Sequence, residues 1–189
     1  MRIVAMALLT TAVLTSAACA NPIIAEWFYV DFDPPNRLHA VYPAANSVVD
    51  AYLVLDLTMS PAQEFRTIAF RLELTPAMWA DPVFTSLLPG GVVVGTWNTG
   101  ITLTSAQCVS TFPAAVAKLT FRYTGNPGDV LIRDHPQKPR WVVDCADPGQ
   151  VFTYCVVSHG GVGKGAVAGD FGGSLVQDVT WSAIRALYR

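Results

Sequence analysis

Residues 67–75 read Thr67-Ile68-Ala69-Phe70-Arg71-Leu72-Glu73-Leu74-Thr75, so apolar and polar side chains alternate along them. A period of two residues is typical of a strand with one face on a core, and no helical stripe fits these positions. The stretch therefore predicts a half-buried β-strand. Its inward face would carry Ile68, Phe70, Leu72 and Leu74, and its outward face Thr67, Arg71, Glu73 and Thr75.

The same alternation returns in residues 116–124, with Ala117, Leu119, Phe121 and Tyr123 expected inward and Lys118, Thr120 and Arg122 outward. Other segments with the composition of strands are 24–32, 48–58, 91–97, 101–104, 129–133, 140–145 and 151–157. Clusters of Pro, Gly and Asn separate them, as turns require. Short strands at this spacing predict an all-β chain, folded as a two-sheet antiparallel β-sandwich of the jelly-roll kind.

Helical spacing occurs in two short places. Pro76 to Ala80 is expected to form a brief helical turn, with Thr75 as its cap and Pro76 at the tolerated first position. Residues 179–189 predict a short amphipathic C-terminal helix, which either packs on its own sandwich or serves as a docking tail. Its defining residues are Trp181, Ile184, Arg185, Leu187, Tyr188 and Arg189.

The first twenty residues predict a secretory signal peptide. Arg2 precedes an apolar run over 3–14 and a small-residue stretch over 16–20. Cleavage after Ala20 fits the small-x-small rule, whereas cleavage after Ala18 would put Cys19 first, as in a lipoprotein. The run is too short to span a bilayer, so we expect a secreted or cell-surface protein without a membrane span.

The chain then divides into a signal peptide over 1–20, a β-sandwich domain over 21–157, a glycine-rich loop or tether over 158–178 and the helix over 179–189. The glycine-rich part includes Gly160-Gly161-Val162-Gly163-Lys164-Gly165. A phosphate loop would need Gly at 158 and Ser or Thr at 165, where this chain has Ser158 and Gly165. The prediction for this part is a flexible loop.

The charge content excludes one class of partner. Charged residues make up 14% of the chain, and the formal net charge is −2. A phosphate backbone demands a basic stripe, which this sequence lacks, so we expect no nucleic-acid partner. The abundance of apolar residues also argues against disorder.

Removal of residues 1–20 leaves Cys108, Cys145 and Cys155 in an oxidising compartment. An odd count predicts one disulfide plus one unpaired thiol or an intermolecular link. A hairpin centred on residues 147–149 would not place Cys145 directly opposite Cys155. A bridge from Cys108 to either of them therefore stays open.

No catalytic or metal-binding set assembles in the sequence. His39, His135 and His159 lie far apart, and Ser158 beside His159 lacks the strand–turn–helix context of an exposed nucleophile. Calcium favours oxygen clusters, which occur at Asp31, Asp33 and Asn36 and again at Asp144 and Asp147. Because these residues are also common in turns, we expect no cofactor, with calcium as the alternative.

The order of features from Val48 to Pro136 resembles the cohesin-like β-sandwich domains of uncharacterised secreted bacterial proteins. The resemblance covers about half of the chain and rests on residues 51–55, 68–74, the Pro89-Gly90-Gly91 turn before 92–96, 117–123 and 128–130. It implies a binding or surface module, and it identifies no dockerin-binding residues.

We therefore expect a non-enzymatic module for binding or assembly, whose partner is a protein or glycan of the cell envelope or extracellular matrix. One alternative is a carbohydrate-binding module, in which Trp79 and Trp97 would form an exposed, coplanar stacking strip. The other is a jelly-roll glycoside hydrolase, which needs two carboxylates facing each other in a cleft.

Overall fold

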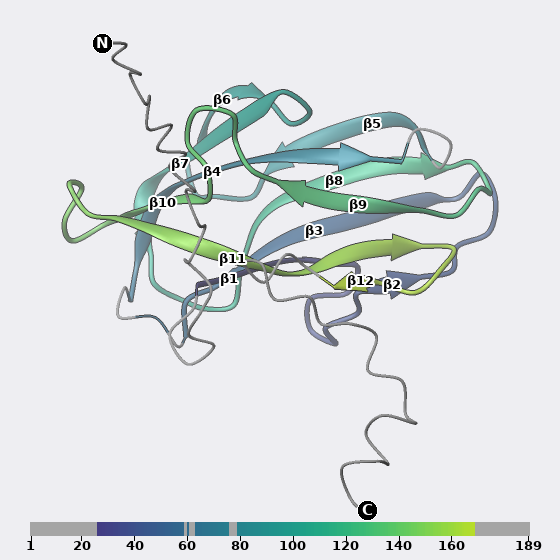
Figure 1. Ribbon diagram of the computed structural model, residues 1–189, viewed down its shortest axis with the longest axis horizontal. Helices are drawn as coiled ribbons and strands as arrows, with labels where there is room; N and C mark the ends of the chain where they lie inside the picture. Colours follow the sequence, from purple (N-terminus) through teal and green to yellow (C-terminus); the bar gives the residue numbers. More distant parts are fainter. Residues whose placement is uncertain (1–25, 59, 61–62, 76–78, 169–189) are drawn as a thin grey trace, which may run out of the picture.

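The computed structural model describes residues 26–58, 60, 63–75 and 79–168. Within them the chain forms twelve strands (Figure 1), and no helix long and apolar enough to cross a bilayer occurs there. The all-β prediction is confirmed for this part of the chain. The strands are β1 (Glu26–Asp31), β2 (Ala40–Val41), β3 (Val48–Asp56), β4 (Phe65–Leu74), β5 (Trp79–Ser86), β6 (Val92–Thr96), β7 (Gly100–Val109), β8 (Ala114–Tyr123), β9 (Gly128–Arg133), β10 (Trp141–Asp144), β11 (Val151–Val162) and β12 (Val167–Ala168).

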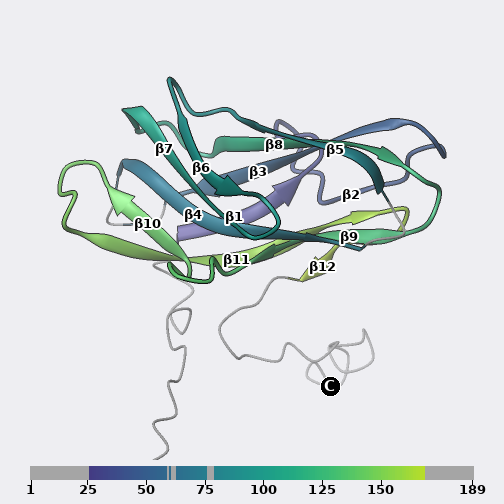
Figure 2. The same cartoon turned by 90° about the horizontal axis from the view of Figure 1, so that it is seen from above.

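The strands form a sandwich of two sheets that share β11 (Figures 1 and 2). The first sheet has the order β5-β8-β3-β1-β11, and the second has the order β6-β7-β4-β10-β11. Residues 151–153 of β11 pair with β10, and the following residues pair with β1. β9 pairs with the second half of β4 and with the end of β11.

Two of the pairings, β1 with β11 and β11 with β2, are parallel. The sandwich is therefore of mixed strand direction, whereas the sequence predicts an antiparallel one. Alternation along a strand reports which side chains are buried, but it carries no information on the direction of the neighbouring strand.

The predicted inward faces of β4 and β8 are confirmed. The alternating residues Ile68 to Leu74 of β4 and Ala117 to Tyr123 of β8 are buried. They pack around the rings of Phe28, Phe70 and Tyr154, whose centroids lie 5.2 Å (Phe28–Phe70) and 4.9 Å (Phe28–Tyr154) apart. Burial of each such side chain contributes about 1.5–3 kcal/mol, so these rows hold the two sheets together.

The predicted helical turn is wrong in the part that the structure describes. Trp79 and Ala80 begin β5 and pair with Tyr123 and Arg122 of β8, while residues 76–78 lie outside the described residues. β5 is an edge strand, where a proline such as Pro82 is tolerated. Its interrupted, half-exposed pattern is the reason that the sequence did not indicate a strand.

The expected flexible loop begins too early, because residues 158–162 continue β11. Gly160 and Gly161 are buried, and a Cβ on Gly160 would lie 2.5 Å from Val30 Cγ1. These glycines allow close backbone approach within a strand rather than flexibility. Residues 167–168 form β12 against β11. Residues 169–178, the predicted signal peptide and the predicted C-terminal helix lie outside the described residues.

The predicted disulfide is confirmed and joins Cys108, near the end of β7, to Cys145, directly after β10. β4 lies between these two strands in the sheet, so the bridge ties them together past the start of β4. The expected unpaired thiol is wrong: none of the cysteines in the described part is free, and Cys155 is also disulfide-bonded.

Candidate functional site

The outer face of the second sheet is built from two rows of side chains that cross five strands. Directly paired residues point to the same side of a sheet, so the strand register defines each row. One row is Val92, Thr104, Thr67, Val143 and Val151. The other is Val94, Thr102, Ala69, Trp141 and Thr153. These residues are called the threonine–valine face below.

The threonine–valine face carries no charged side chain. Thr67 and Thr104 share a hydrogen bond between their hydroxyls at 3.1 Å, and Lys138 Nζ lies 4.5 Å from the centroid of the Trp141 ring. A cation over an aromatic face is attracted to it, so Lys138 covers part of the indole. Because the two rows contain no ion pair, another protein can cover them without removing water from paired charges.

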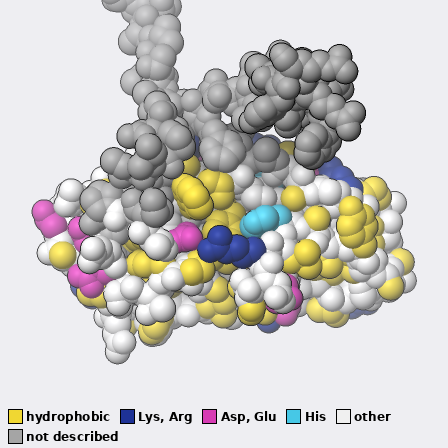
Figure 3. Space-filling model, turned by 90° about the horizontal axis from the view of Figure 1, so that it is seen from below, with side chains coloured by type: hydrophobic (Ala, Val, Ile, Leu, Met, Phe, Trp, Pro, Cys, Tyr) yellow, Lys and Arg dark blue, Asp and Glu magenta, His cyan; other side chains and the backbone are white. Residues whose placement is uncertain are grey.

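The outer face of the first sheet differs because it is charged. Asp50 on β3 accepts hydrogen bonds from Lys118 Nζ at 3.1 Å and from the Thr120 hydroxyl. Arg122 of β8 pairs with Asp81 of β5 at 3.1 Å. Figure 3 shows another side of the molecule, the edge that lies lowest in Figure 1, where acidic, basic and histidine side chains lie among hydrophobic ones. Covering ion pairs costs desolvation, so covering the threonine–valine face would cost less than covering the outer face of the first sheet.

The threonine–valine face ends at β6, which is an edge strand. Val92 is 60% exposed and Val94 is 63% exposed. An edge strand presents unpaired backbone N–H and C=O groups, and proteins often protect it with charges or proline. β6 reads Val-Val-Val-Gly-Thr and has neither. Exposed apolar side chains on such an edge are typical of an interaction site.

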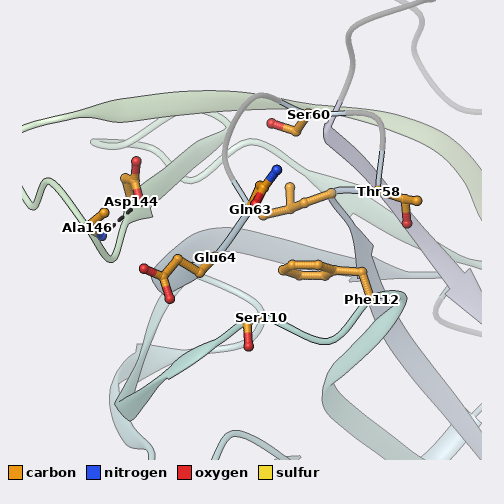
Figure 4. A pocket seen from close by; sticks show the side chains of 9 residues that line it. Thr58, Ser60, Gln63, Glu64, Ser110, Phe112, Asp144 and Ala146 are labelled. Atoms are coloured by element: carbon orange, nitrogen blue, oxygen red, sulfur yellow. Dashed lines mark hydrogen bonds between the residues drawn. The ribbon is translucent and has the colours of Figure 1, made fainter.

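A hollow of about 690 Å³ lies at the end of the sandwich next to Asp144 and Ala146. Figure 4 shows Glu64 and Asp144 on one side of it and Thr58 on the other. Asp144 Oδ1 accepts the backbone N–H of Ala146 at 3.0 Å, so this carboxylate stabilises the turn after β10. Glu64 supplies the other carboxylate of the described lining.

Glu64 also lies near the disulfide, with a carboxylate oxygen within 4.8 Å of the sulfur atoms of Cys108 and Cys145. A metal would bind thiolates, whereas these two sulfurs are bonded to each other. This group of residues is therefore a structural one.

Trp79 and Trp97 contact each other, but their rings are nearly perpendicular. The centroids are 6.0 Å apart and the planes meet at 83°. Both side chains are half-buried and pack against the core. A sugar-stacking strip needs exposed rings in one plane, so this pair does not form one.

The three histidines are held by backbone groups of different segments. His39 Nδ1 donates to the carbonyl oxygen of Val30 at 2.8 Å, and His159 Nδ1 accepts the N–H of Ile132 at 3.1 Å. His135 Nδ1 accepts the backbone N–H of Gln137. Burial, followed by the charge of Lys138, lowers the pKa of His135.

The oxygen clusters considered for calcium stabilise turns. Asp31 Oδ1 accepts the N–H groups of Asp33 and Leu38 at 2.8 and 2.9 Å, and Asp33 Oδ2 accepts from Asn36 at 2.6 Å. Asp147 Oδ1 accepts the N–H of Gly149 at 3.0 Å. These are the bonds that Asp and Asn make in ordinary turns.

Solved cohesin modules have the same architecture. The sixth cohesin of scaffoldin B from Acetivibrio cellulolyticus, solved with a Cel5 dockerin, has a TM-score of 0.52 at 12% identity, covering 73% of this chain and 97% of the cohesin. The OlpC cohesin of a type I cohesin–dockerin complex from Clostridium thermocellum has a TM-score of 0.51 at 12% identity, covering 74% and 92%. The cohesin module of a family 33 glycoside hydrolase from Clostridium perfringens has a TM-score of 0.51 at 11% identity, covering 74% and 96%. The fold is cohesin-like.

No protein-family model matches the sequence. The comparison with curated proteins found no match either. At identities of 11–12% the likeness establishes the fold alone.

Sequence reasoning did not find the surface of this cohesin-like domain. The alternation in β4 correctly placed Thr67 and Arg71 outward, but the partners of Thr67 in the sheet, Thr104 and Val143, come from distant segments. An uncharged outward position on each of several strands was the available signal. The residues of the predicted docking tail, Trp181, Ile184, Arg185, Leu187, Tyr188 and Arg189, lie outside the described residues.

Proposed function

We propose that this chain is a non-enzymatic module that binds a protein partner through the threonine–valine face and assembles it at the cell surface or outside the cell. The observation that carries the proposal is the contrast between the two outer faces. The two rows of the threonine–valine face are uncharged and open along β6, and the Arg133–Glu73 ion pair lies beyond them, on β9 and the second half of β4. The outer face of the first sheet is covered by ion pairs. The location outside the cytoplasm rests on the signal peptide expected over residues 1–20.

The cohesin-like fold supports the proposal. The cohesins from Acetivibrio cellulolyticus and Clostridium thermocellum were solved in complex with dockerins, which are proteins. A β-sandwich of this kind can therefore serve protein assembly without an active site.

The chemistry of the face fits a partner protein. Val92 and Val94 offer apolar anchors, the threonine hydroxyls accept and donate hydrogen bonds, and Trp141 provides an aromatic ring of the kind enriched at binding hot spots. The free edge of β6 offers backbone groups to which an extended segment can add as a further strand.

The test compares three immobilised forms of the full chain: wild type, the double variant Val92→Lys/Val94→Lys, and Val83→Lys. Val83 is the matched control because it is 57% exposed on β5, the opposite edge of the sandwich. The secreted proteins of the source culture are passed over each form and the retained proteins are identified by mass spectrometry. We expect a protein that wild type and Val83→Lys retain equally and that the double variant loses by about tenfold or more.

Equal retention of every protein by all three forms, with circular dichroism showing that each is folded, would reject the threonine–valine face as the docking surface.

Glycan binding is tested separately by affinity electrophoresis in gels containing cellulose, xylan or chitin. Retardation that Trp97→Ala abolishes would favour a carbohydrate-binding module instead. Turnover of glycoside, ester or peptide substrates at enzyme-like rates would contradict the non-enzymatic assignment.

A further inference from the structure

Arg71 is a partly buried arginine for which the described part of the chain supplies no anionic partner. Its Nε is shielded from solvent, and no described residue accepts a hydrogen bond from it. A buried N–H without an acceptor is unfavourable, and more so when it belongs to a charged group. The Nε–H group of Arg71 therefore still needs a hydrogen-bond acceptor.

The surroundings of Arg71 strengthen that requirement. Arg71 on β4 is directly paired with Arg133 on β9, and like charges at such a position repel. Arg133 has a carboxylate partner in Glu73 at 3.0 Å, and Arg140 has one in Asp134 at 3.0 Å. Among the described ion pairs, none includes Arg71.

The three arginines line one small hollow. Its volume is about 230 Å³, and Asp134, Ile132 and Val156 complete its walls. Arg71 also borders a second hollow of about 280 Å³, which Trp79 and Trp97 help to line, and Trp79 Nε1 is likewise buried without an acceptor in the described part. Donors thus face these spaces from several directions, and one carboxylate lines each of them, Asp134 in the first and Glu73 in the second.

Arg71 continues the threonine–valine face. Thr67, Ala69 and Arg71 follow one another at every second position of β4, so all three point outward. A protein seated on the face would therefore have its own surface next to the guanidinium of Arg71.

We infer that Arg71 is the receptor for a single carboxylate, that of an Asp or Glu side chain on the docking partner. The planar guanidinium matches a carboxylate in a two-pronged geometry and makes short, charge-assisted hydrogen bonds with it. Asp134 in the wall of the hollow repels a doubly charged phosphate more strongly than a carboxylate of one charge. The carboxylate site itself follows from the contacts of Arg71, and its source in a partner protein rests on the proposed function.

The experiment follows the side-chain Nε–H signals of Arg71 and Arg133 by ¹⁵N NMR in the full chain. The probes are glutamate with both ends blocked, the equivalent blocked glutamine, and inorganic phosphate. We expect the glutamate probe to shift both signals saturably, the glutamine probe to shift neither, and phosphate to bind more weakly than glutamate. Arg71→Gln should abolish the shift of the Arg133 signal. Arg71→Lys should weaken binding of the glutamate probe by about tenfold, because lysine lacks the two-pronged guanidinium.

Arg122→Gln is the matched control, since Arg122 is an exposed arginine on the other sheet, paired with Asp81. It should bind the glutamate probe as wild type does. The melting temperature of Arg71→Gln should equal or exceed that of wild type, because the variant removes an uncompensated charge. A large fall would show that Arg71 has a structural role and would overturn the inference.

The carboxylate site would also be overturned if the glutamate probe did not shift the Arg71 and Arg133 signals, or if the glutamine probe shifted them equally. Tighter binding of phosphate than of glutamate would overturn it as well. None of these outcomes affects retention of a partner by the threonine–valine face. Conversely, glutamate binding together with unchanged retention by Val92→Lys/Val94→Lys would leave the site standing and reject the docking function.

Discussion

At Gly160 the chain has no room for a side chain. A Cβ there would lie 2.5 Å from Val30 Cγ1 and 2.9 Å from the ring of Phe32. Gly160→Ala should lower the free energy of unfolding by about 1–3 kcal/mol, because overpacking forces neighbouring side chains or backbone to move. Urea denaturation measures the change.

Gly165→Ala is the control for that substitution, because nothing lies within 4 Å of the added Cβ. Its effect should stay within about 0.5 kcal/mol. Equal effects of the two substitutions would show that Gly160 is not packed closely in solution.

Tyr154 joins the two sheets through its hydroxyl, which donates to the carbonyl oxygen of Ala69 at 3.0 Å. Burial is the main cause that raises the pKa of Tyr154 above its ordinary value. The folded protein therefore keeps the phenol neutral at a pH where the unfolded chain ionises, near about 10. The stability that this contributes is fully present below about pH 10 and is lost as the pH rises above it.

Tyr154→Phe should make the unfolding free energy fall less steeply between about pH 10 and 11.5, since one raised phenol is removed. At pH 7 the same variant should be less stable by about 1–2 kcal/mol, because the Ala69 carbonyl loses its donor. Urea titrations at a series of pH values measure both effects. Tyr42→Phe, at an exposed tyrosine, should leave the pH profile unchanged, and an identical change in both variants would contradict the assignment.

Among the elements, β7 and β10 are tied together by the Cys108–Cys145 disulfide, whose cysteines are 37 positions apart. A cross-link of this loop length stabilises the folded chain by about 3–4 kcal/mol, chiefly by restricting the unfolded state. Cys108→Ser/Cys145→Ser should lower the unfolding free energy by about that amount. Urea denaturation without reductant measures it, and an unchanged midpoint would show that the bridge does not form.

For the whole molecule, the shared strand β11 predicts a single cooperative unit. Its residues pair with β10 in one sheet and with β1 in the other, and both sheets contribute to one core. We expect two-state unfolding in which both sheets are lost together. Fluorotryptophan NMR can follow Trp27 of the first sheet and Trp141 of the second during urea titration, and separate midpoints would contradict this prediction.

The sequence could predict what depends on neighbours along the chain. Alternation in residues 67–75 and 116–124 determined which side chains are buried, and therefore the β-sandwich class. The polar positions of the same alternation also placed Thr67 and Arg71 on the outward face. Local signals failed at two places. Trp79 was predicted to lie in a helical turn but begins an edge strand, and Gly160 was predicted to lie in a flexible loop but allows a close backbone contact within a strand.

Only the tertiary structure determined which strands are neighbours. The threonine–valine face exists because the register sets Val94, Thr102, Ala69 and Trp141 side by side, although they are far apart in sequence. The environment of Arg71 depends on pairing in the same way, because the register of β4 with β9 places Arg133, another cation, directly opposite it. Alternation is a property of one strand, whereas a surface is a property of the pairing between strands, and pairing depends on long-range contacts that a period of two residues does not encode.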